Sequence, residues 1–64
     1  MYDLRVFFPG EPACRVSVPI VYASDVMASI PQILSMYLGC ERIDVMLDTT
    51  KLFALDGAGH ALRD

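Results

Sequence analysis

Two runs near the N-terminus alternate apolar and polar residues with a period of two. Residues 2–8 form the first run and residues 13–22 the second, and they are separated by Pro9-Gly10-Glu11-Pro12, a segment with turn chemistry. The positions expected to share the inward face are Tyr2, Leu4, Val6 and Phe8 in the first run, and Cys14, Val16, Val18, Ile20 and Tyr22 in the second. The pattern predicts a β-hairpin with one buried face.

The register of this hairpin follows from charge. Inward residues must pair with inward residues, so the numbers of paired residues sum to an even value. A sum of 20 would place Arg5 opposite Arg15, which repulsion disfavours, whereas a sum of 22 places Phe7 opposite Arg15 and allows a cation–π contact. We therefore predict the register in which the numbers of paired residues sum to 22. Pro19 has no N–H for a ladder, which predicts that the second strand is an edge.

The middle of the chain changes to helical periodicity. Val26, Ile30, Ile33 and Tyr37 recur at helical spacing, and the stripe runs through Pro31 without losing phase. We expect a helix over residues 25–38, with Ser24 as the N-cap and Gly39 just beyond the last turn. Because proline removes one helical hydrogen bond, we also expect a break near residues 27–30, as a kink or as a one-turn prelude to a second helix start.

Period-two alternation returns after Gly39. Residues 43–47 and 51–56 are predicted strands with a turn at Thr49-Thr50, residues 57–59 a loop, and residues 60–62 a possible short terminal strand. The order β-β-α-β-β(-β) predicts an α+β fold in a single domain, residues 1–64, with one helix packed on a mostly antiparallel sheet.

This order resembles the β-grasp arrangement in outline only. Members of that arrangement that act as sulfur carriers or in conjugation need a C-terminal Gly-Gly, and this chain ends in Arg63-Asp64. The iron–sulfur members need four cysteines, and the chain has two. The resemblance therefore implies a strand order and no activity.

Composition adds a surplus of apolar residues. Of the 64 residues, 55% are hydrophobic and 20% charged, although a chain this short has a mostly wet surface. The surplus predicts an interface, either with a second copy or with another protein. The alternative is an ordinary small core with scattered apolar residues on the surface.

Charge and motif content exclude several classes of function. A net charge of −3 with a single lysine and scattered arginines disfavours binding to nucleic acid. No apolar run reaches the roughly 20 residues of a membrane span, and the N-terminus lacks the layout of a signal peptide, so we expect a cytoplasmic protein with no membrane partner. Cys14 and Cys40 are expected to be buried thiols, because no CxxC motif is present.

Chemistry-bearing side chains are few. The single histidine, His60, follows Asp56 in the segment Asp-Gly-Ala-Gly-His. Such a glycine-rich segment is also a common turn sequence of β-hairpins. Asp44, Asp48 and Asp56 could hold a divalent ion together with His60 if the last strands pair, but no ligand spacing supports such a site. We therefore predict no catalytic residues, no metal, no cofactor and no enzymatic activity.

Four apolar residues are candidates for binding a partner. Met36 lies off the apolar stripe of the helix, and Phe7, Val21 and Met46 point away from the expected core, so the last three would form an apolar patch on the far face of the sheet. The alternative is that long neighbouring side chains cover them.

These patterns favour a small non-catalytic interaction module, an inhibitor or adaptor that binds a protein through an apolar sheet face or an edge strand. Its acidic residues could steer it toward a basic surface, and a phage or mobile element is one expected source. One alternative is a homodimer with a small-molecule or metal site at its interface, built from His60 and the aspartates. Another is a subunit fragment of a larger assembly, stable only when docked.

Overall fold

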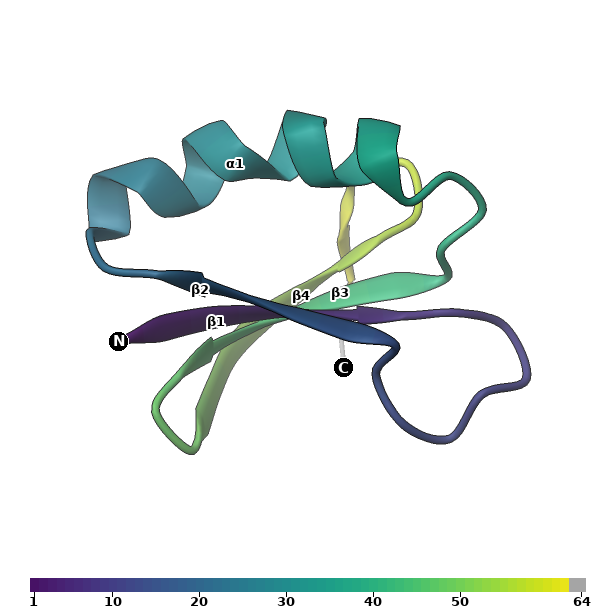
Figure 1. Cartoon of the computed structure of the whole chain (residues 1–64), viewed down its shortest axis with the longest axis horizontal. Helices are drawn as coiled ribbons and strands as arrows, with labels where there is room; N and C mark the ends of the chain where they lie inside the picture. The colour runs from purple at the N-terminus through teal and green to yellow at the C-terminus, as the bar shows by residue number, and fades with distance from the viewer. Residues whose placement is uncertain (63–64) are drawn as a thin grey trace.

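The computed structural model describes residues 1–62 and shows one helix packed on one face of a five-stranded antiparallel sheet (Figure 1). The strand order in the sheet is β2-β1-β3-β4-β5. The elements are β1 (Tyr2–Phe7), β2 (Val16–Ile20), α1 (Ala23–Met36), β3 (Arg42–Leu47), β4 (Thr50–Asp56) and β5 (Ala61–Leu62). The predicted α+β class and element order are confirmed.

The first hairpin has the predicted register. Leu4 pairs with Val18 and Val6 with Val16, so paired numbers sum to 22, and β2 is an edge of the sheet. The cation–π contact differs from the prediction, because the Arg15 guanidinium lies over the ring of Phe8, 3.7 Å from its centroid. The second strand, Val16–Ile20, is also shorter than residues 13–22. Glu11 and Arg15 form an ion pair in the loop before it.

Pro19 turns its nitrogen toward the open edge of the sheet. The N–H of Arg15 donates to the carbonyl of Val6, which shows that the backbone groups of Val6 face β2. Backbone groups of successive strand residues point to opposite sides, so those of Asp3 face β3. Asp3 is the register partner of Pro19, and the two therefore form a non-hydrogen-bonded pair. The proline removes no hydrogen bond from the sheet.

The helix is continuous through Pro31, and the predicted break near residues 27–30 is wrong. Met27 and Pro31 are both exposed, so the Met27 carbonyl, which loses its helical donor, lies on the side of α1 that water reaches. Tyr22 is the N-cap and makes no side-chain cap hydrogen bond, so Ser24 lies inside the helix and is not its cap. Gly39 has a positive φ of 85° and redirects the chain just beyond the C-terminal end.

Replacing Pro31 with alanine should stabilise the domain by about 1–2 kcal/mol. The substitution restores the N–H that the Met27 carbonyl lacks and removes the ring clash, which together are worth about 3 kcal/mol, while the more flexible unfolded chain offsets about 1 kcal/mol of this gain. Urea denaturation of both proteins measures the difference. A free energy of unfolding that stays level or falls would show that the helix already accommodates the ring without strain.

The core lies between α1 and the central strands. Leu4, Val6, Ile43 and Val45 are completely buried and come from β1 and β3, two of the three inner strands of the sheet. The remaining members of the core cluster are Val26, Ile30, Ile33, Cys40 and Leu55. The helical stripe predicted from the sequence thus supplies the upper half of the core.

The second half of the chain differs in detail from the prediction. The turn between β3 and β4 is Asp48-Thr49, one residue earlier than predicted, and Asp48 adopts a positive φ of 55°. A bulge near Val45 and Met46 leaves Leu52 as an extra residue in β4. The loop at residues 57–59 and the terminal strand, as Ala61–Leu62, are confirmed. Within residues 1–62, no helix has the length and hydrophobicity needed to cross a bilayer.

Candidate functional site

The face of the sheet opposite α1 is charged. Three of the five basic residues, Arg5, Arg42 and Lys51, lie on this face around the buried carboxylate of Asp44. The Arg42 Nε is 2.8 Å and the Lys51 Nζ 3.7 Å from Asp44 Oδ1, and Arg5 is the register partner of Asp44. These cations looked scattered along the sequence, but the β1–β3 and β3–β4 pairings bring them together.

The predicted apolar patch on this face does not exist. Met46 points to the open face as expected but is only 8% exposed, because neighbouring side chains cover it. Phe7 is half-buried, and the Arg42 guanidinium lies 4.0 Å from its ring centroid. Val21 is exposed but follows the last residue of β2 and does not join the other two. The alternative, in which long side chains cover the apolar ones, describes Met46 and Phe7.

His60 and the three aspartates do not converge. Asp44 is paired with Arg42 on the sheet, and Asp48 lies at the β3–β4 turn, 3.4 Å from the N-terminal amine. His60 adjoins only Asp56, with Nδ1 3.9 Å from Oδ2. In the part of the chain that the structure describes, no three His, Cys, Asp or Glu side chains are grouped to hold a metal ion.

Asp56 organises the hairpin between β4 and β5. Its Oδ1 accepts hydrogen bonds from the backbone N–H groups of Ala58 and His60, both at 2.9 Å. The N–H of His60 is the main cause of a lowered pKa of the Asp56 carboxyl. The Asp-Gly-Ala-Gly-His segment is thus a turn closed by its own aspartate, with the His60 ring left in solvent.

The contribution of Asp56 to stability should disappear in acid. Because its pKa is lowered on folding, the carboxylate stabilises the fold above the unfolded pKa near 3.8, and this stabilisation is lost as the pH falls through the folded pKa. The gap in free energy of unfolding between the natural chain and Asp56→Ala should therefore be full at pH 6 and shrink toward pH 2. Asp56→Asn is the control, since it keeps an acceptor but does not titrate. A gap independent of pH would contradict the assignment.

The two cysteines are free thiols in different environments. Cys40 is buried in the core cluster, and burial raises the pKa of its thiol, which keeps it protonated. Cys14 is half-buried in the loop before β2. The expectation of two buried thiols thus holds fully for Cys40 and in part for Cys14.

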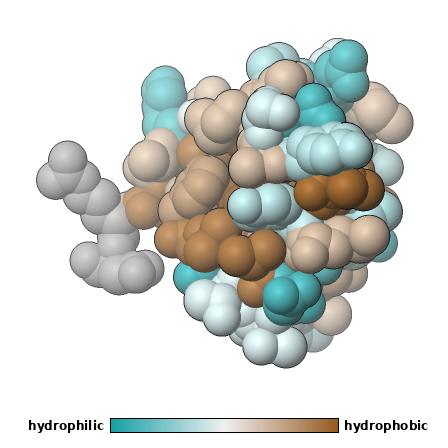
Figure 2. Space-filling model, turned by 90° about the vertical axis from the view of Figure 1, so that its left-hand side faces the viewer, coloured by the Kyte–Doolittle hydropathy of each residue, from teal (hydrophilic) through white to brown (hydrophobic). Residues whose placement is uncertain are grey.

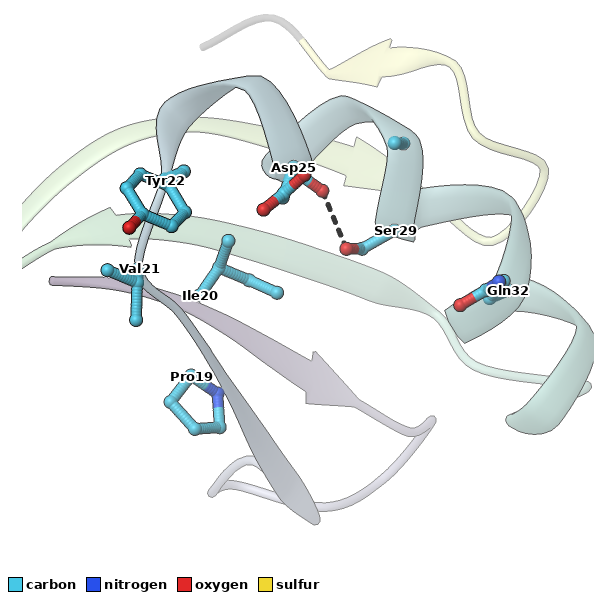
Figure 3. Close-up of a pocket in the computed structure, with 8 residues that line it drawn as sticks. Pro19, Ile20, Val21, Tyr22, Asp25, Ser29 and Gln32 are labelled. Carbon is cyan, nitrogen blue, oxygen red and sulfur yellow. Dashed lines mark hydrogen bonds between the residues drawn. The ribbon is translucent and has the colours of Figure 1, made fainter.

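A groove of about 430 Å³ lies between the edge strand β2 and the N-terminal half of α1 (Figure 3). Asp25 is its one charged lining residue, and Val21, one of the predicted partner-binding residues, lies at its end. The other lining residues are Pro19, Ile20, Tyr22, Ala28, Ser29 and Gln32. In the close-up, the Ser29 hydroxyl bonds to the Asp25 carbonyl at 2.6 Å, which ties that side chain back to its own helix.

The solvent side of α1 is nearly free of charge. Of the 14 residues in the helix, only Asp25 is charged. Met27 and Met36 on the helix are 62% and 71% exposed, and Leu38 just after it is 81% exposed. We call this area the α1 surface and define it as Met27, Ala28, Pro31, Gln32, Ser35, Met36 and Leu38, all exposed.

Sequence reasoning identified Met36 but missed Met27, Ala28 and Leu38. Met27 and Leu38 are apolar residues close to the helical stripe in sequence, but the buried side of the helix is limited to Val26, Ile30 and Ile33 and leaves both exposed. The signal that could have found this surface is the uncharged run of residues 26–40, which covers more than the buried side of one helix.

A second group of exposed apolar side chains lies on the strands far from β2. Leu52 and Phe53 on β4 and Leu62 on β5 are each more than a third exposed. Figure 2 shows hydrophobic side chains gathered on part of the face that it draws. This group is smaller and less exposed than the α1 surface.

The charged sheet face, the α1–β2 groove and the α1 surface are therefore the features on which a function can be based. Comparisons with protein-family models, with curated proteins and with solved structures gave no match for this chain.

Proposed function

We propose that this protein is a small non-catalytic interaction module, of the inhibitor or adaptor type, that binds a protein partner through the α1 surface. One observation carries the proposal: a 14-residue surface helix bears a single charge and exposes two methionines. Helices that face only water usually carry charged residues on the outer side. Flexible thioethers on an uncharged surface suit contact with another protein.

The other surfaces support binding less well. On the open face of the sheet, Arg42 and Lys51 each pair with the carboxylate of Asp44. The edge of β2 has no donor at Pro19, so an added strand would find an incomplete set of backbone partners there. We therefore propose the outer side of the helix as the binding surface, in place of the apolar sheet face or edge strand expected from the sequence.

Site-specific photo-cross-linking in the native host tests this function. A benzophenone side chain placed at Ala28, on the α1 surface, should give a covalent adduct with a protein, whereas the same side chain at Thr49, an exposed residue of the β3–β4 turn, should give none. Adding Met36→Glu to the Ala28 probe should reduce the yield at least about tenfold, because a buried unpaired carboxylate opposes binding. Equal yields at both positions, or no adduct at either, would refute the proposal.

A further inference from the structure

We infer that the partner seated on the α1 surface is a second copy of this chain, in a symmetric dimer that packs α1 against α1. This inference rests on the proposed function and names its partner. In a two-fold interface the same patch meets itself, so that patch must be complementary to its own chemistry. The α1 surface meets this condition, because it is uncharged and offers apolar side chains on both sides of small ones.

The distribution of charge supports a second copy over a charged partner. Each chain carries a net charge of −3, and two copies would repel if their acidic residues met. Asp25 is the one charged residue of α1 and is not part of the α1 surface. Other charges lie farther away, with Arg42, Asp44 and Lys51 on the opposite face of the sheet and Asp48 and Asp56 at turns. The molecule is at least 21 Å across, well beyond the screening length of about 8 Å at physiological salt. Packing through α1 thus keeps most like charges apart.

The length of the α1 surface can be compared with the size of a stable dimer interface. A standard interface needs about 800 Å² from each partner, which is roughly a fifth of the 4245 Å² that this chain exposes. A 14-residue helix is about 21 Å long, against a longest molecular dimension of 29 Å. The seven exposed residues of the α1 surface run from Met27 to Leu38, along most of the helix and just past its end.

Symmetry gives the position of one residue. Ala28 is near the middle of α1 and exposed on its outer side, so in a two-fold dimer of crossing helices it lies close to Ala28 of the other copy. Two glutamates at this position would repel each other across the axis, and two lysines would do the same. A glutamate in one copy and a lysine in the other would attract.

Sedimentation equilibrium of Ala28→Glu, Ala28→Lys and their equimolar mixture tests the dimer. The natural chain should sediment at twice the 7.1 kDa mass of one chain. Each variant alone should dissociate with a Kd at least about tenfold higher, and the mixture should recover the dimer mass. Thr49→Glu and Thr49→Lys are the matched controls and should leave the dimer unchanged. Circular dichroism of each variant verifies the fold, which an exposed helical position tolerates.

Three outcomes would overturn the inference: a natural chain that stays monomeric up to millimolar concentration, a dimer unaffected by charge at position 28, or a mixture that does not recover the dimer. The cross-linking experiment separates these from failure of the proposed function. If the probe at Ala28 forms an adduct with a different protein, the proposed interaction module is supported and the dimer is refuted. A monomer that forms no adduct rejects both.

Discussion

Replacing Gly57 with alanine should destabilise the domain by about 3 kcal/mol, the upper range for forcing extra atoms into a packed site. A Cβ built on Gly57 would lie 2.2 Å from the carbonyl oxygen of Cys40, which is backbone and cannot rotate away. The clash would push apart the chain before β3 and the chain after β4. A domain of this size has a total stability of roughly 3–10 kcal/mol, so the variant should lose between about a third and all of it.

Urea denaturation followed by circular dichroism measures this loss, and Gly10→Ala is the matched control. Gly10 has a positive φ of 79°, and no atom lies within 4 Å of the point that a Cβ would occupy there. Alanine at this position therefore meets backbone strain of about 1 kcal/mol and no clash. At Gly57 the situation is reversed, because an added Cβ would clash with the Cys40 carbonyl although the backbone φ is not positive. Equal losses at the two positions would show that the approach of Gly57 to Cys40 is not tight.

Leu4→Ala should cost about 3–4 kcal/mol. Leu4 is completely buried on β1, which pairs with β2 on one side and β3 on the other, and it belongs to the core beneath α1. Truncation removes transfer free energy and leaves a cavity between two paired strands that cannot collapse freely. The loss approaches the whole stability of a domain this small.

The control for Leu4 is the same substitution at Leu38, which is almost fully exposed. Leu38→Ala should change the free energy of unfolding by less than about 0.5 kcal/mol at concentrations where the chain is monomeric. The same variant should weaken association through the α1 surface. A loss at Leu4 no larger than that at Leu38 would mean that the core is not packed as described.

The strands could be predicted because apolar residues alternate with polar ones along each strand and so mark the side that is buried. Alternation located β1 and β3, and the repulsion between Arg5 and Arg15 was enough to select the register of the first hairpin. Pro19 identified β2 as an edge, because a proline lacks the N–H that an inner strand needs to bond on both sides. These inferences needed only local sequence and one pairing.

The helix shows the limit of local rules. Proline opposes helix continuation locally, but the buried residues Val26, Ile30 and Ile33 lie on both sides of Pro31 and hold the two halves against one sheet. The burial of three side chains outweighs one lost hydrogen bond whose carbonyl faces water. The capping prediction was also wrong, because α1 begins at Ala23 after Tyr22, which makes no side-chain cap hydrogen bond.

The site could not be read from the sequence because it depends on neighbours far apart in the chain. Met46 looked exposed by alternation alone, but β3 is an inner strand, and residues from the strands on either side cover it. The grouping of Arg5, Arg42 and Lys51 likewise required the β1–β3 pairing. The expected outward direction of Met46 was right, and its burial followed from topology.

The outward nitrogen of Pro19 has a consequence for behaviour at high concentration. A sheet grows into a filament by adding strands at its edges, and each addition needs a complete row of donors and acceptors. One edge of this sheet lacks a donor at Pro19. The other consists of β5, only two residues long, and of the first part of β4, where the bulge near Val45 and Met46 interrupts the regular ladder. Neither edge is a good template for polymerisation. Concentrated solutions of this apolar chain should therefore contain small closed complexes and no cross-β fibres, which thioflavin fluorescence would detect.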